Sequence, residues 1–254
     1  MEVHHHSHTS RKKWTHYFWE FLMLFLAVFC GFLAENFREH TVESKRERAY
    51  IKLMIEDFQN DTTTLRRQIK LMNQYVKGLD TLITETYAYK NHKGDTRKMY
   101  YCYHHYCRNR ITPTLTKITI TQLKNSGNLR LIHDKQAVDI ISNAEIFFEW
   151  LDENIRFWDA RQEDVTNFGL KIFDFGEYKK ANIEPDGSTN QTDDGFLKLN
   201  YQPPLNFTDL VYLNEFSARV GYYRNSLDVY ITLLKRRIPF FENSINTLKK
   251  AYNF

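Results

Sequence analysis

The segment YYCYHHYCRNR, residues 100–110, holds the densest group of side chains that could bind a metal ion or react: Cys102, His104, His105 and Cys107. Thiolates and imidazoles are typical zinc ligands, but this C-x4-C spacing lacks a second ligand pair at a standard distance. In an oxidising compartment the two cysteines could form a disulfide instead. On one continuous helix that bridge would require a turn, because residues five apart point to different sides. We favour the third interpretation, in which both are unpaired thiols that pack inside the protein.

A second chemical feature is the carboxylate of Glu20, which lies inside the apolar stretch RKKWTHYFWEFLMLFLAVFCGFLAEN, residues 11–36. Helical spacing places Glu20 on or near one face with His16, Ala27 and Gly31. Ala27 and Gly31 form a small-x-x-x-small pair, which lets transmembrane helices approach closely. Two interpretations stay open: Glu20 extends toward His16 and the lipid headgroups, or this face packs against another span and Glu20 is paired there. A proton or ion path is less favoured, because one acid on one span supplies no relay.

The element that carries Glu20 is predicted as a transmembrane helix over residues 14–35. At 1.5 Å per residue, the 21 residues from Trp14 to Ala34 cover about 31 Å, close to the roughly 30 Å of a bilayer's hydrocarbon core. Phe29 and Phe32 occupy positions where a signal peptidase would require small residues, so we expect an uncleaved anchor.

The flanking charges predict the orientation of the span. Residues 1–13 are expected to form a basic, His-rich, cytoplasmic tail, because Arg11, Lys12 and Lys13 adjoin the first span. A compact basic cluster at this position usually stays in the cytoplasm. Residues 36–254 are then an extracytoplasmic domain.

Composition narrows the class of this domain. The 254 residues include 35 basic and 31 acidic side chains, for a net charge of +4, and the basic residues are scattered among acidic ones. A nucleic-acid partner is therefore not expected. The chain has only 9 Gly and 5 Pro, which favours long helices over many turns.

Three stripes of apolar residues at alternating steps of four and three predict three long helices. The stripes run Ile51, Ile55, Phe58, Thr62, Leu65, Ile69, Met72, Val76, Leu79 and Ile83; Ala137, Ile141, Ala144, Phe148, Leu151, Ile155, Trp158, Gln162 and Val165; and Leu213, Phe216, Val220, Tyr223, Leu227, Tyr230 and Leu234. Further apolar residues beside the first stripe favour an antiparallel bundle over a dimeric coiled coil. These are Leu53, Met54, Leu71, Tyr75 and Leu82.

The rest of the chain is expected to connect these helices. A further helix is predicted over Thr114 to Lys124, with Gly127 as a left-handed carboxyl cap. Pro239 should stop or kink the third long helix. Residues 169–211, rich in turn-forming residues, are predicted to be an irregular connection with a binding surface. The predicted fold class is all-α: a transmembrane helix that continues into an antiparallel helical bundle with this long irregular connection.

Two stretches, residues 11–36 and ITITQLKNSGNLRLI at residues 118–132, resemble an uncharacterised bacterial family of small single-span membrane-anchored proteins, a family defined by a domain of unknown function. The resemblance implies a bacterial, membrane-anchored protein. It brings no activity and no catalytic residue.

No sequence motif of a common enzyme class is present: no nucleophile elbow, phosphate loop or dinucleotide fingerprint. We therefore expect a non-enzymatic scaffold, adaptor or sensor-like subunit of a bacterial envelope assembly, without a cofactor. Its expected partners are the lipid bilayer and, through the span, a second copy or another membrane protein. The alternative is a subunit of an ion-conducting or energy-coupled membrane complex that uses Glu20. A metal-dependent extracytoplasmic enzyme built on Cys102 to Cys107 is the least favoured.

Overall fold

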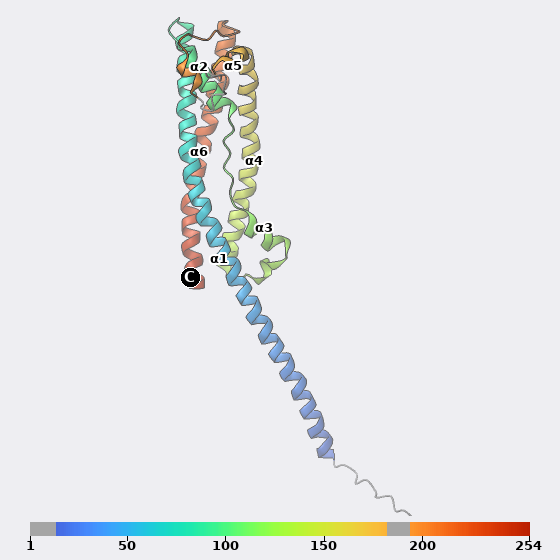
Figure 1. Ribbon diagram of the computed structural model, residues 1–254. Coiled ribbons are helices and arrows are strands. Elements are labelled where there is room, and N and C mark those ends of the chain that lie inside the picture. The colour runs from blue at the N-terminus through green and yellow to red at the C-terminus, as the bar shows by residue number, and fades with distance from the viewer. Residues whose placement is uncertain (1–13, 182–193) are drawn as a thin grey trace, which may run out of the picture. The chain divides into compact units, whose positions relative to one another are not determined.

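The computed structural model describes residues 14–181 and 194–254, and within these residues the protein is all-α, as predicted (Figure 1). Three helices are long, and they are connected by short helices and extended segments. Their bounds are α1 (Trp14–Lys90), α2 (Thr96–Cys102), the π-helix η1 (Tyr103–Arg108), α3 (Ile118–Asn125), the 3-10 helix η2 (Asn128–Leu131), α4 (Lys135–Ile172), α5 (Phe175–Ala181), the 3-10 helix η3 (Gly195–Lys198) and α6 (Leu210–Tyr252).

The chain divides into two compact units, Met1–Ile51 and Lys52–Phe254, and α1 contributes to both. Among the described residues, α1 is the one helix that is long and apolar enough to cross a membrane, judged by length and composition. None of its most apolar 18-residue window is buried. Large side chains that are more than half exposed include Trp14, Phe21, Leu24, Val28 and Phe32.

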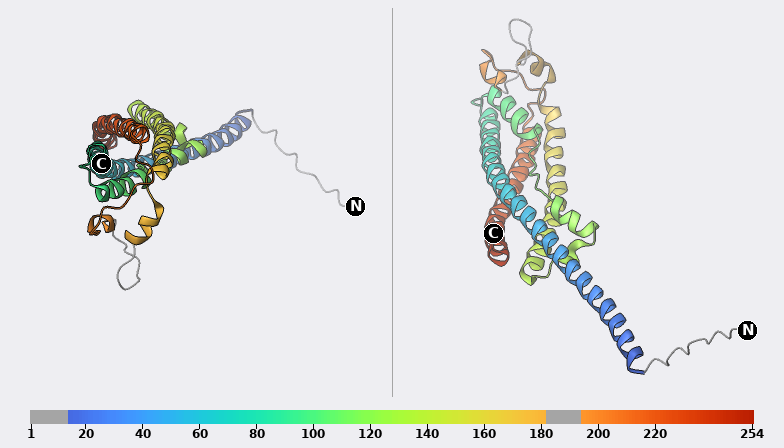
Figure 2. Two further views of the ribbon diagram at one scale, coloured as in Figure 1. Left: turned by 90° about the horizontal axis from the view of Figure 1, so that it is seen from above. Right: turned by 60° about the horizontal axis from the view of Figure 1, so that its bottom comes forward.

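The second unit is a bundle of α1, α4 and α6 (Figures 1 and 2). Within it, α1 and α4 run in the same direction and α6 runs in the opposite one, so that α6 lies antiparallel to both. The bundle core is the predicted set of stripes. The third stripe is buried throughout, and the first two are buried except at Ile83 and Ile155, which are half-buried.

The predicted widening of the first stripe is only partly correct. Met54, Tyr75 and Leu82 are buried, but Leu53 and Leu71 are 45% and 39% exposed. The core side of α1 is therefore narrower than expected, because the other two long helices cover only one side of it.

The predicted helix from Thr114 to Lys124 is wrong in its first turn, because α3 begins only at Ile118. Residues 109–117 are instead extended and run along the bundle opposite in direction to α4 (Figure 1). Pro113 explains the difference, since a proline disfavours helical geometry at the preceding residue and removes a backbone donor. Ile111, Pro113 and Leu115 are buried in alternation, so this segment fills the fourth position of the bundle as a strand would.

Of the two residues predicted to mark helix ends, Gly127 does so and Pro239 does not end its helix. Gly127 adopts the left-handed conformation after α3, with φ 67°. Pro239 does not stop α6, which continues to Tyr252. The proline lies on the exposed side of the helix, where water can satisfy the freed carbonyl, while Phe241 and Leu248 keep the last turns buried.

The predicted irregular connection, residues 169–211, is shorter than expected and contains α5 and η3. Helix α4 continues to Ile172, and Phe173 forms an isolated antiparallel bridge with Leu205. The turn motif EPDG, residues 184–187, lies outside the described residues, as does the first half of TDDG, residues 192–195.

Candidate functional site

The segment with the cysteines and histidines changes helix type in its middle. Helix α2 ends at Cys102, and the π-helix η1 follows directly. Hydrogen bonds in a π-helix join residues five apart, so positions with that spacing return toward one side. Both Cys102 and Cys107 are consequently buried. The expectation for residues five apart applied to one continuous helix, and this segment is instead an α-helix followed by a π-helix.

Cys102 and Cys107 are both buried thiols. Neither is in a disulfide. Burial raises the pKa of Cys102 to about 12 and that of Cys107 well above its ordinary value. A protonated thiol is a poor nucleophile and a poor metal ligand, and both side chains pack inside the protein.

The two histidines contact different parts of the protein. The ring of His104 lies 5.3 Å from that of Tyr178 in α5, and its Nδ1 is 3.1 Å from the Arg108 guanidinium. The ring of His105 stacks on Tyr101 at 5.6 Å. Across the described residues, no three His, Cys, Asp or Glu side chains gather as a metal site would require.

The π-helix is held by polar side chains of α4. Gln162 donates from Nε2 to the carbonyl oxygens of Cys107 and Asn109, at 3.1 and 2.9 Å. The Thr166 hydroxyl donates to the Cys107 carbonyl at 2.8 Å, and the Tyr103 hydroxyl donates to the Thr166 carbonyl at 2.6 Å. Gln162 is the polar member of the second stripe, and these bonds explain its burial, because buried carbonyls need donors.

At two glycines, a tyrosine ring from residues 100–110 occupies the space that a Cβ atom would take. A Cβ atom added to Gly169 would lie 2.1 Å from the Tyr103 ring, and one added to Gly78 would lie 2.0 Å from the Tyr106 ring. Residues 100–110 therefore join α1 to α4 by close packing. Their arrangement supports the bundle.

In the first unit, the structure places His16 and Glu20 in contact, with His16 Nε2 3.1 Å from Glu20 Oε1. The two side chains are half exposed. Ala27 and Gly31 are exposed, and no atom outside the helix backbone approaches the Cβ position of Gly31 within 4 Å. The face predicted from helical spacing thus carries one polar pair and one open patch of small residues.

Sequence reasoning missed a buried carboxylate. Asp61 is 1% exposed, and its Oδ1 accepts a hydrogen bond from the backbone N–H of Thr116 at 2.7 Å. Burial raises the pKa of this carboxyl to about 6. Asp57, one turn earlier, accepts from Thr119 N at 3.4 Å. The pair of acids four residues apart is the only sequence signal, and it gives no hint of the segment that it binds.

Compared with protein-family models, with curated proteins and with solved structures, the chain gives no match in any of the three.

Proposed function

We propose that this protein is a membrane-anchored, non-enzymatic subunit of a bacterial envelope assembly, with the role of a scaffold, adaptor or sensor. The observation that carries the proposal is the exposed apolar surface of α1 between residues 14 and 35. Soluble monomers rarely expose a continuous apolar patch larger than a few hundred Å². A surface of this kind needs a bilayer or a protein partner to cover it.

The distribution of side chains around the helix favours the bilayer. A helix that docks on a protein is apolar on one stripe, whereas one surrounded by lipid is apolar all round. In residues 21–34 every side chain is apolar, and almost all are exposed. Trp14, Tyr17 and Trp19 lie at one end, where amphipathic rings suit a headgroup boundary. The contact between His16 and Glu20 lies at this same end, so an interfacial position would let water and headgroups solvate the pair.

The proposed orientation has the amino terminus in the cytoplasm and residues 36–254 in the periplasm, on the strength of the basic cluster before the span. The resemblance to a bacterial membrane-anchored family supports the inner membrane as the location. The patch of Ala27 and Gly31 supports an oligomer, or a complex with another membrane protein, through the span.

Fractionation and reporter fusions test the location. We expect the full-length protein, expressed in a bacterial host, to stay in the membrane pellet after alkaline carbonate washing. A carboxyl-terminal alkaline phosphatase fusion should be active, and the matching green fluorescent protein fusion should be dark. Release of the protein by carbonate would contradict the anchor, and the reverse reporter pattern would contradict the orientation.

Crosslinking tests the partner. Cys30 is an exposed thiol next to the small-residue patch, whereas the other two thiols are buried. A membrane-permeant bismaleimide should therefore trap a disulfide-independent dimer through Cys30, and Cys30→Ser should abolish it. A heavier adduct that contains a second polypeptide would identify a different membrane partner. A protein that stays monomeric and copurifies with nothing would rule out association through the span.

A further inference from the structure

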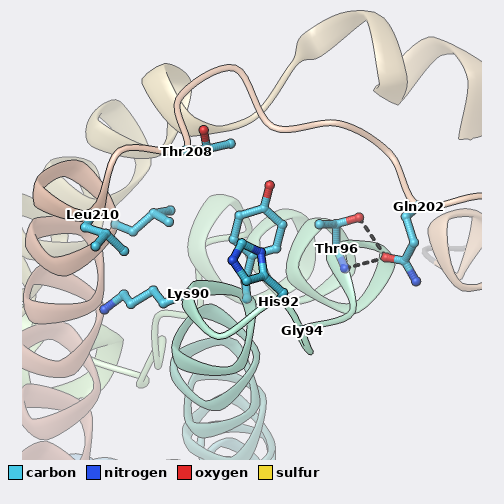
Figure 3. A pocket seen from close by; sticks show the side chains of 9 residues that line it. Lys90, His92, Gly94, Thr96, Gln202, Thr208 and Leu210 are labelled. Carbon is cyan, nitrogen blue, oxygen red and sulfur yellow. Dashed lines mark hydrogen bonds between the residues drawn. The ribbon is translucent and has the colours of Figure 1, made fainter.

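The second unit has a pocket at one end and a groove along one side. The pocket, of about 540 Å³, lies between the end of α1 and the start of α6, and its lining includes Lys90, His92 and Leu210. Figure 3 shows that the Lys90 side chain is directed away from His92, and its ammonium donates to Asn214. These two basic groups therefore do not converge on one ligand.

The groove, of about 220 Å³, lies between α4 and α6 and has a largely apolar lining. Trp158 and Tyr230 line its base, where their rings are 5.0 Å apart and both residues are 5% exposed. Phe157 of α4 and Val229 of α6 line its edges and are more than half exposed. The base is thus closed, while large apolar side chains at the edges remain open to contact with another molecule.

Each edge of the groove belongs to an outer stripe, a row of residues at steps of three and four that lies beside the buried stripe of the same helix. The outer stripe of α4 is Ile146, Trp150, Glu153, Phe157 and Arg161, and that of α6 is Tyr222, Ser226, Val229, Leu233 and Arg236. Four of these residues are at least 60% exposed: Ile146, Phe157, Tyr222 and Val229. Rows with this spacing pack against a neighbouring helix, and among the described residues no helix covers these two.

Arg161 joins the two outer stripes. Its guanidinium lies 3.4 Å from the centre of the Phe157 ring and 4.8 Å from that of Tyr222, and it donates to the Tyr222 hydroxyl at 2.9 Å. These contacts hold both exposed rings in place. The surface is therefore ordered in advance, which lowers the entropic cost of binding a partner.

The two outer stripes carry opposite charges at a similar level of the bundle. Asn154 and Leu233 both line the groove and so lie across from each other. Because α4 and α6 are antiparallel, Glu153 and Arg236 are displaced from these two residues in the same direction, by one and three positions, and lie within about one helical turn of each other along the bundle. Both are exposed, and neither makes an ion pair in the described part of the chain. Each charge is available to a partner that presents the opposite charge at this level.

We propose that a second copy of this chain covers the groove, with the outer stripe of α4 in each copy packed on the outer stripe of α6 in the other. The orientation rests on the proposed anchor: two copies whose spans lie in one membrane pack side by side with their bundles in the same direction. A two-fold axis along the bundle then places α4 of one copy against α6 of the other. Since α4 and α6 are antiparallel, the four helices form an antiparallel bundle.

This arrangement fits the side chains of both stripes. Phe157 of each copy packs on Val229 of the second copy, so both halves of the interface bury the exposed edges of the groove. Glu153 of each copy faces Arg236 of the second copy, which gives both charges a partner. The opposite orientation would pack α4 on α4 and would require the two spans to enter opposite membranes.

Pairwise cysteine crosslinking in native membranes tests the interface. All variants carry Cys30→Ser, which removes the exposed thiol of the span, and the other two thiols are buried. Two chains with different tags are co-expressed, one with Phe157→Cys and the other with Val229→Cys, and are oxidised with copper phenanthroline. We expect a disulfide-linked dimer that contains both tags. Leu71→Cys, at an exposed residue of α1, replaces Val229→Cys in the control and should give no such dimer.

Charge reversal tests the pairing across the interface. Glu153→Arg and Arg236→Glu should each lower the crosslinked fraction by about fivefold or more, because the symmetric dimer contains two copies of each new like-charge contact. The two changes combined in every chain should restore crosslinking. Glu163→Arg, at an exposed acid of α4 outside the outer stripe, is the control and should crosslink as the unreversed chains do.

Carbonate washing of the same membranes separates this proposal from the proposed anchor. Protein that stays in the pellet without the dimer of Phe157→Cys and Val229→Cys chains would overturn the interface alone. Crosslinking between two Phe157→Cys chains in its place would also overturn it, because that product requires α4 to pack on α4. Unchanged crosslinking in both charge-reversed variants would overturn the assigned pairing. Release by carbonate of protein that still forms the expected dimer would contradict the anchor and support the interface.

Discussion

Helix α1 contains two regions with opposite relations to their surroundings. Between residues 21 and 34 its side chains are apolar on every side, and Leu24 and Val28 are 67% and 68% exposed. Between residues 52 and 90 the apolar residues form one stripe, and Leu65 and Leu79 are completely buried. Both regions form the same regular helix, so backbone conformation does not distinguish them.

The two regions differ in the surroundings that their side chains suit: a protein core and water in one, and lipid in the other. In the bundle, a one-sided stripe buries apolar area against α4 and α6 and leaves charged side chains in water. In the first region, no side of the helix is suited to water. The period of the apolar residues therefore separates a helix made for a protein core from one made for lipid, even when the helix is uninterrupted.

Charges placed on the two regions should give the largest contrast. Leu24→Arg combined with Val28→Arg puts two charges near the centre of the proposed span, at a cost of roughly 5–7 kcal/mol for the pair on insertion scales. We expect this variant to be lost from the carbonate-washed membrane pellet. The control combines Leu53→Arg with Leu71→Arg on the exposed side of α1 in the second unit, and it should remain in the pellet. Equal retention of both variants would contradict the lipid-facing interpretation.

Truncating side chains on the two sides of α1 in the second unit should lower the free energy of unfolding by different amounts. Leu65→Ala removes a completely buried side chain and should lower the free energy of unfolding by about 2–5 kcal/mol. Leu53→Ala, at a residue 45% exposed, should change it by less than about 0.5 kcal/mol. Urea unfolding of the full-length protein in detergent, followed by near-ultraviolet circular dichroism, measures both. Similar losses in the two variants would mean that a partner covers the Leu53 side.

The buried carboxylate of Asp61 makes the bundle sensitive to pH. Its pKa of about 6 lies above the ordinary value of 3.8, chiefly because of burial, so the folded state disfavours the charged form. The carboxyl is protonated in both states below about pH 3. As the pH rises to about 6 the unfolded chain ionises first, and stability falls by at most roughly 3 kcal/mol in total.

Substitution of Asp61 should remove this dependence. Asp61→Asn keeps an oxygen that accepts from Thr116 N, and we expect it to gain stability relative to the natural protein between pH 4 and pH 7.5. Asp61→Ala should show the same gain with pH but be less stable than the asparagine variant throughout, because Thr116 N loses its acceptor. Unfolding curves at the two pH values measure both effects. If the free energy of unfolding changed equally with pH in Asp61→Asn and in the natural protein, the buried acid would titrate as it does in the unfolded chain.

The sequence was sufficient to predict the three long helices, because their apolar periods are local and unbroken. It did not predict the extended segment that fills the fourth position. That segment depends on contacts across the bundle, from Asp61 to Thr116 and from Gln162 to Asn109, which the local sequence of the segment does not indicate. The pocket with Lys90 was missed for the same reason, since it joins the end of one long helix to the start of another.

The smallest expected contrast between the two regions of α1 is the effect on stability of replacing a glycine by alanine in each. Alanine usually stabilises a helix by about 1 kcal/mol relative to glycine. At Gly78, however, the added methyl group would lie 2.0 Å from the Tyr106 ring, and displacing this ring should cost about 1–3 kcal/mol. At Gly31 nothing lies within 4 Å, so Gly31→Ala should leave the unfolding of the bundle unchanged.

Gly221→Ala in α6 calibrates these two variants, because its methyl group would meet only Ile83 Cδ1 at 4.0 Å and should stabilise the bundle by up to about 1 kcal/mol. We expect the order of stability Gly221→Ala, then Gly31→Ala, then Gly78→Ala in urea unfolding. A Gly78→Ala variant as stable as Gly221→Ala would mean that the Tyr106 ring moves aside without cost. In that case the packing of residues 100–110 on α1 would be looser than the close contact at Gly78 indicates.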